Sequence, residues 1–247
     1  MTADLLTVLW KERKGLFRVQ GGRSRALLTM LLPVVMIAII LPVQMGRDYL
    51  TGAWPLVASL VIPVLLVGMT IPESFAGERE RHTLPTLLAS RLPDRAILFG
   101  KWGLGVGYGF AMTLLVLLVS LTTVNILHWE GQIMFYRASM AWAHVCVGLL
   151  MSGLIASLGV LVSLRSATVQ GAQQALMSVI LIPLFLLQVV PMLLLSVIPN
   201  GRDLLRQLIS INFTHFALIT VGILVALNVG FLLAAMARFQ RARLILD

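Results

Sequence analysis

A charged stretch that separates two long apolar runs decides how this 247-residue chain is organised. Residues 73–101 read ESFAGERERHTLPTLLASRLPDRAILFGK. Four of the chain's ten acidic residues fall here, beside five basic ones: Glu73, Glu78, Glu80, Asp94, Arg79, Arg81, Arg91, Arg95 and Lys101. A connection that only reversed the chain would not need so many charges. We therefore expect a structured segment outside the bilayer that a partner recognises.

The composition of the whole chain indicates an integral membrane protein. Hydrophobic residues make up 59% and charged residues 12%, with a mean hydropathy of +0.95, whereas soluble domains carry about 25% charged residues. The single cysteine, Cys146, excludes an intramolecular disulfide and a thiolate metal cluster. The N-terminus lacks the basic-start, apolar-core order of a signal peptide, so we expect it to be retained.

Six apolar segments are long enough to cross a bilayer core about 30 Å thick as helices. They are residues 26–45, 54–72, 102–127, 139–164, 175–198 and 215–237. An even number of spans places both termini on one side, and fifteen of the nineteen Lys and Arg residues lie on that side. The positive-inside rule makes it cytoplasmic. The net charge of +9 is then mainly an orientation signal, which disfavours nucleic-acid binding.

Two further segments have an amphipathic helical pattern. Residues 1–24 predict a helix on the inner leaflet with Trp10 at the headgroup boundary, and a partner-binding role in addition stays open. Residues 199–214, on the outside, predict a short re-entrant or interfacial helix, because Leu204, Leu208 and Ile211 follow a helical stripe. The fold class is therefore all-α and membrane-integral, with a single transmembrane domain over residues 1–247.

Within the charged stretch, the alternating charges of residues 78–81 favour solvent. A helix is expected to restart after them, with Thr83 as its N-cap and Pro85 in its first turn, and to end about two turns later near residues 91–93. Three leucines share one face of this helix at i, i+3 and i+4: Leu84, Leu87 and Leu88. An exposed leucine face favours a partner's hydrophobic groove, and the alternative is a helix lying on the membrane surface.

Residues 75–101 resemble the loop between the second and third spans of ATP-binding-cassette (ABC) type 2, export-class permeases. The matching positions are Glu78, Glu80, Arg81, Thr83, Leu84, Leu87, Leu88, Gly100 and Lys101. Residues 10–35 resemble the family's elbow helix leading into a first span broken by proline, and the order of the spans agrees along essentially the whole chain. Four sites depart from the pattern: His82 where the family often has glycine, Pro85 where it often has glutamate, Arg91 where proline is frequent, and residues 212–214 (Asn-Phe-Thr) where it often has Asn-Pro.

The resemblance implies a membrane-spanning permease subunit of an ABC exporter in the plasma (inner) membrane, with residues 73–101 as a cytoplasmic coupling loop. The chain has no Gly-rich phosphate loop, so it is not expected to be an enzyme. A separate ATPase subunit would bind ATP and Mg²⁺, and two of them would pair with a homodimer of this chain. The ATPase-coupling residues would be Glu73, Glu78, Glu80, Arg81, Thr83, Leu84, Leu87 and Leu88. No catalytic residue, metal site or cofactor is expected in the chain itself.

Substrate handling leaves a weaker pattern in the sequence. No span carries a charged residue near its centre, and the deepest polar side chains are Asn125, His144, Gln188 and Asn228. Three are candidate pathway residues, Gln188, Asn125 and Asn228, although such groups are more often interhelical hydrogen bonds. Four alternate glycines open the third span and predict close helix packing: Gly103, Gly105, Gly107 and Gly109.

Two other functions are compatible with the sequence. The chain could be a scaffold subunit that transmits ATPase motion to an extracytoplasmic accessory protein, or a haem-export-type permease. A secondary transporter is disfavoured because intramembrane charge and an inverted repeat are not seen. A membrane enzyme is disfavoured because the four histidines are scattered. The transported substrate is not indicated.

Overall fold

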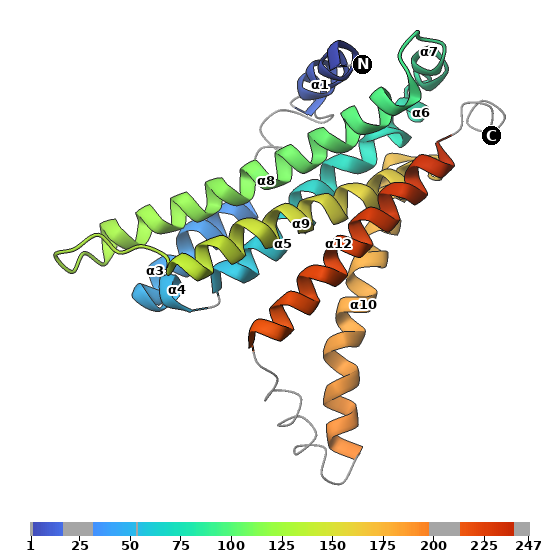
Figure 1. Cartoon of the computed structure of the whole chain (residues 1–247). Helices are drawn as coiled ribbons and strands as arrows, with labels where there is room; N and C mark the ends of the chain where they lie inside the picture. The colour runs from blue at the N-terminus through green and yellow to red at the C-terminus, as the bar shows by residue number, and fades with distance from the viewer. Residues whose placement is uncertain (1, 17–31, 53, 198–212, 240–247) are drawn as a thin grey trace.

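The computed structural model describes residues 2–16, 32–52, 54–197 and 213–239, and helices are the only regular elements among them. The elements are α1 (Thr2–Leu16), η1 (Met36–Ile40), α3 (Leu41–Met45), α4 (Arg47–Thr51), α5 (Trp54–Thr70), η2 (Ile71–Ser74), α6 (Ala76–Glu80), α7 (Leu84–Leu88), α8 (Asp94–Leu127), α9 (Ala138–Ser163), α10 (Val169–Val197) and α12 (Phe213–Arg238). Figure 1 shows α1, α6, α7 and the last turn of α12 at one end of the bundle. The other end carries α3, α4 and the connection between α8 and α9.

Five described helices are long and apolar enough to cross a membrane, judged by length and composition: Trp54–Ser74, Asp94–Leu127, Ala138–Ser163, Val169–Leu186 and Leu218–Arg238. They correspond to the second to sixth expected spans. The first expected span, residues 26–45, is described from residue 32 onward as a shorter apolar helix, Leu32–Met45. The expected outer segment lies outside the described residues except for 213–214, which begin α12, and residues 17–24 of the expected elbow helix also lie outside them.

The described part of the first span changes its helical pitch just before a proline. Pro42 cannot donate the hydrogen bond that would normally reach the carbonyl of Ala38. The chain forms the π-helical turn η1 over this stretch, and Thr123 Oγ1 of α8 donates to Ala38 O at 3.5 Å. A π-turn and a donor from a neighbouring helix are both known ways to accommodate such an interruption.

The helix that forms the third span starts earlier than expected. It begins at Asp94 rather than near residue 102, after Pro93 in an extended conformation (φ −67°, ψ 145°). The prediction that a two-turn helix before it ends near residues 91–93 is also wrong, because α7 has five residues and ends at Leu88. Pro93 favours a new helix start and Asp94 complements the helix dipole in its first turn. Residues 94–101 therefore form the first two turns of the same continuous helix that makes the third span.

Helix α9 lies in the middle of the bundle and packs against α5, α8 and α12 (Figure 1). Two of the four glycines at the start of the third span permit this packing: a Cβ on Gly105 would lie 2.5 Å from Ile71 Cδ1, and Gly109 faces Val67 and Ser152. Gly103 and Gly107 have no neighbour within 4 Å of such a Cβ. The prediction of close packing thus holds for one face of α8 only.

Helix α10 contacts the remainder of the bundle near its beginning. Ala172 and Leu176 are buried, whereas residues 181–186 are exposed. Figure 1 shows the helix running away from α9 beyond this point. The first three turns of α10 therefore connect it to the end of the bundle where α6 and α7 lie.

Candidate functional site

A buried lysine in the N-terminal part of α8 joins three segments of the chain. The Lys101 side chain is 1% exposed, and its Nζ lies 2.7 Å from Glu12 Oε1 of α1 and 3.7 Å from Glu78 Oε1 of α6. It also donates to Ser74 O at 2.6 Å and lies 5.2 Å from the centre of the Phe75 ring. A buried cation requires such partners, because an unpaired charge out of water is strongly destabilising.

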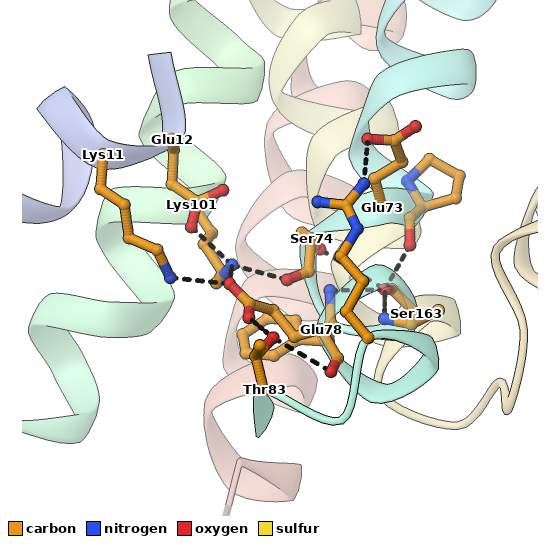
Figure 2. Close-up of polar contacts among 12 residues, drawn as sticks. Lys11, Glu12, Glu73, Ser74, Glu78, Thr83, Lys101 and Ser163 are labelled. Carbon is orange, nitrogen blue, oxygen red and sulfur yellow. Dashed lines mark hydrogen bonds and ion pairs between the residues drawn. The ribbon is translucent and has the colours of Figure 1, made fainter. Parts of the chain in front are cut away.

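Glu78 extends this network toward α1 and the next turn of the chain, as Figure 2 shows. It accepts from Lys11 Nζ at 2.8 Å and from the Thr83 hydroxyl. Burial would raise the pKa of Glu78, but the nearby Lys101 and Lys11 ammonium groups and the Thr83 hydroxyl lower it overall. A small cavity of about 70 Å³ lies beside the network, lined by Glu12, Thr70, Ile71, Glu73, Ser74, Glu78, Arg81, Lys101, Leu104 and Gly105.

The next two charges of α6 bind opposite ends of two membrane helices. Arg79 donates to the carbonyls of Leu164 and Ser166, which follow the C-terminus of α9. Glu80 Oε1 accepts from Val169 N at 2.8 Å, at the N-terminus of α10. A cation is favourable at a helix C-terminus and an anion at an N-terminus because of the helix dipole. The alternation of sign in the sequence therefore matches the polarity of the two helix ends.

The expectation that the alternating charges of residues 78–81 favour solvent holds in part, because Glu80 and Arg81 are exposed and the other two are half-buried. Arg81, the fourth of them, lies 3.8 Å from Glu73 at the end of η2. All four charges thus have partners within the chain. The reason is spatial: α6 lies where the ends of α1, α8, α9 and α10 meet, and the three charges of α6 contact these helix ends, whereas Arg81 turns back to η2.

A serine of α9 holds the turn from the second span into α6 (Figure 2). Ser163 Oγ accepts from the backbone N–H groups of Phe75 and Ala76 at 3.0 and 2.9 Å, and it donates to Pro72 O at 2.8 Å. All of these residues are buried. One hydroxyl therefore satisfies three backbone groups that the change from 3₁₀ to α-helix would otherwise leave unpaired.

The turn between α6 and α7 is a Schellman motif with a histidine at its left-handed position. Thr83 N donates to Glu78 O at 2.9 Å and His82 N donates to Arg79 O at 3.0 Å, and His82 has φ 55°. Glycine is preferred at this position because it has no Cβ to clash there. The left-handed conformation at residue 82 gives a physical reason for the glycine that the export-class permeases often have at this position. Thr83 precedes α7 but does not cap it, because its hydroxyl turns back to Glu78.

The three leucines of α7 are buried, which contradicts the expectation of an exposed leucine face. Leu84, Leu87 and Leu88 are 4%, 9% and 3% exposed and belong to the main core cluster. That cluster also contains Ile97 of α8, Ala235 of α12 and Phe239. A direct contact of these leucines with a partner does not fit this packing. The exposed side of α7 instead carries three small residues: Pro85, Thr86 and Ala89.

The polar residues expected to couple to an ATPase lie together around α6, and the structure adds five residues that contact them or hold α6 in place. Their role in coupling stays a prediction. The added residues are Lys11, Glu12, Arg79, Lys101 and Ser163. The position of Lys101 at the border of an apolar run was a usable signal for a buried ion pair. Ser163 gave no signal, because a serine inside a helix ordinarily bonds its own backbone.

Two of the three candidate pathway residues make hydrogen bonds that hold the fold. Asn125 Nδ2 donates to Leu121 O and Met134 O, and its Oδ1 accepts from Met134 N. Asn228 Nδ2 donates to Leu150 O of α9 at 2.9 Å, and its Oδ1 packs against Gly153. Gln188 lies in α10, but its side chain is outside the described residues. Their part in a substrate pathway stays a prediction.

No group of three His, Cys, Asp or Glu that could hold a metal ion occurs in the described part of the chain. His144 of α9 is buried with both ring nitrogens unpaired, and its ring meets Tyr136 edge-on at 5.6 Å.

Comparison with known proteins agrees with the coarse part of the resemblance. No family model matches the chain. The ABC transporter permease protein NatB of Bacillus subtilis (strain 168) is 28% identical over 187 residues, which are 73% of this chain and 43% of NatB. The chain therefore spans less than half the length of this relative. Together with the apolar helices, the similarity supports a multi-pass membrane subunit of the ABC permease kind.

Proposed function

We propose that the chain is the membrane-spanning permease subunit of an ABC exporter and that a separate ATPase subunit supplies the energy. The observation that carries this proposal is the attachment of α6. This five-residue helix is bound by charged or buried polar contacts to α1, α8, α9 and α10. A force applied to α6 and α7 is therefore passed to four membrane-associated helices at once.

Closely packed elements move as rigid bodies rather than deforming continuously. The leucines of α7 contribute to this coupling from inside, because they join α7 to α8 and α12 through the core. The side of α7 that remains for an ATPase is its small exposed face, Pro85, Thr86 and Ala89, with the exposed Arg81 and Arg91 at its edge. Edge charges of this kind contribute more to partner selection than to affinity.

The remaining features of the proposal follow from charge and from the resemblance. The contacts of α6 and Lys101 with α1, α9 and α10 are called the charged junction below. The end of the bundle that carries this charged junction has the excess of Lys and Arg and is the cytoplasmic end, so both termini are cytoplasmic. Two copies of the chain form a homodimer above two ATPase subunits that bind ATP and Mg²⁺. The direction of transport is outward, as in the export-class permeases that the sequence resembles.

The test uses the full chain, affinity-tagged and expressed in its own host. The expected result is co-purification of a protein with a phosphate-binding loop, and ATP hydrolysis by the complex in lipid. Thr86→Trp places a bulky side chain on the exposed face of α7 without touching the buried leucines, and we expect it to abolish both readouts. Gln132→Trp, exposed at the opposite end of the bundle, is the matched control and should retain them. ATP hydrolysis and co-purification that survive Thr86→Trp would contradict the proposed contact face.

A further inference from the structure

At the end of the bundle opposite the charged junction, the connection between α8 and α9 is held by specific polar contacts. Asn125 exchanges two hydrogen bonds with the backbone of Met134, at 2.9 and 2.7 Å. The Tyr136 hydroxyl donates to Leu117 O at 2.9 Å and lies 2.8 Å from Ser120 Oγ. Arg47 of α4 and Glu130 form an exposed ion pair. These contacts give residues 128–137 one defined path.

This path forces a row of apolar side chains to the outside. Residues 133–137 have no helical structure, and in an extended chain successive side chains point to opposite sides. Met134 and Tyr136 pack inward on Tyr49, Leu50 and Val124. Ile133 and Phe135 point the other way and are 63% and 69% exposed, and Trp129 is 59% exposed.

The length of α8 places these side chains at a bilayer boundary. From Lys101 to Leu127 the helix is about 39 Å long at 1.5 Å per residue, or about 37 Å along the membrane normal at a typical tilt of about 20°. If Lys101 marks one edge of a hydrocarbon core about 30 Å thick, Leu127 lies about 7 Å beyond the other edge, inside the headgroup layer. The contact with Asn125 brings Phe135 back toward the hydrocarbon edge.

Two other exposed tryptophans lie at the same end of the bundle. Trp54 begins α5 and Trp142 lies in the second turn of α9. Tryptophan is enriched where membrane meets water, since its ring is amphipathic. The aromatic side chains around the connection are thus of the type expected at that depth.

We propose that residues 128–137 are a lipid-anchoring loop, in which Trp129, Ile133 and Phe135 insert into the boundary of the leaflet opposite the charged junction. On the orientation proposed above, this is the outer leaflet. The polar contacts of Asn125 and Tyr136 hold the loop at a fixed depth. The bilayer is the occupant because the exposed side chains lie within its headgroup layer rather than beyond it. Anchoring fixes the outer ends of α8 and α9 while forces act on their inner ends.

The test measures the depth of single spin labels on the full chain. Cys146→Ser removes the one native cysteine, and new cysteines are placed one at a time by Ile133→Cys, Phe135→Cys and Gln132→Cys. Each nitroxide-labelled protein is reconstituted in phosphatidylcholine–phosphatidylglycerol vesicles. Its collision rates with oxygen, which partitions into lipid, and with a water-soluble nickel chelate are compared by electron paramagnetic resonance.

We expect the oxygen-to-nickel ratio at positions 133 and 135 to exceed that at position 132 several-fold. Gln132 is the matched control because it is an exposed polar residue of the same loop. A higher nickel accessibility at 133 and 135 would place the loop in water and overturn the proposal. Low accessibility to both reagents would also overturn it, because a protein surface would then cover the loop.

Discussion

Replacing Ser163 with alanine tests whether α6 is rigidly attached to the membrane helices. The substitution removes one oxygen that accepts from two buried N–H groups, of Phe75 and Ala76, and donates to Pro72 O. A buried donor left without a partner costs roughly 1–3 kcal/mol. Two such donors, with partial relaxation of the turn, give an expected loss of about 3 kcal/mol in the free energy of unfolding.

The matched control is Ser152→Ala in the same helix. Ser152 is equally buried, but its hydroxyl donates only to Gly148 O of its own helix at 2.7 Å. Removing this hydroxyl leaves no hydrogen-bond donor of another element without a partner. We therefore expect the free energy of unfolding to fall by less than about 1 kcal/mol.

Both variants can be compared with the parent chain by denaturant titration in mixed micelles, monitored by tryptophan fluorescence. A loss for Ser163→Ala equal to that for Ser152→Ala would refute the reasoning. It would mean that the turn from η2 to α6 finds other partners, and that α6 is not held by α9 through this hydroxyl.

Three further predictions concern the junction and the packing of α8. Lys101→Met leaves two carboxylates without their buried cation and should lower the free energy of unfolding in micelles by about 3 kcal/mol. This value is at the low end for a broken buried ion pair, because both carboxylates still reach water. A loss below about 1 kcal/mol would contradict the buried network. Gly105→Ala should destabilise by about 1–3 kcal/mol through overpacking, whereas Gly103→Ala, with open space around it, should be neutral or stabilising in the same titration. The lowered pKa of Glu78 contributes stability that is present above its unfolded value of 4.5 and is lost as pH falls through the folded value. Titrations of the parent and Glu78→Gln should therefore converge below pH 4.5, and a constant difference down to the lowest pH would disprove this linkage.

The positions of the membrane spans were predictable because they depend on local composition. The helices α9 and α12 begin and end within two residues of the expected limits. A run of apolar residues must match the bilayer thickness whatever its neighbours are. The start of α8 was missed because Asp94 and Arg95 are polar, although they lie on the same continuous helix.

The leucine stripe shows where local pattern was insufficient. Helical spacing correctly put Leu84, Leu87 and Leu88 on one face, and α7 starts where Thr83 and Pro85 predicted. Spacing does not say whether a shared face points toward a partner or into the protein's own core. That depends on α8 and α12, whose contact residues are far away in the sequence.

By itself the sequence determined that this is an all-helical membrane protein and where its apolar helices and charged connection lie, since these depend on chain composition over one span length. Only the tertiary structure decided what the charges of that connection do. Lys101 meets Glu12, Arg79 meets the end of α9 and Glu80 meets the start of α10 across separations of more than eighty residues. The residues next to a charged side chain in the sequence do not indicate which distant residue it will pair with. The partner is selected when helix packing brings complementary charges and helix ends together.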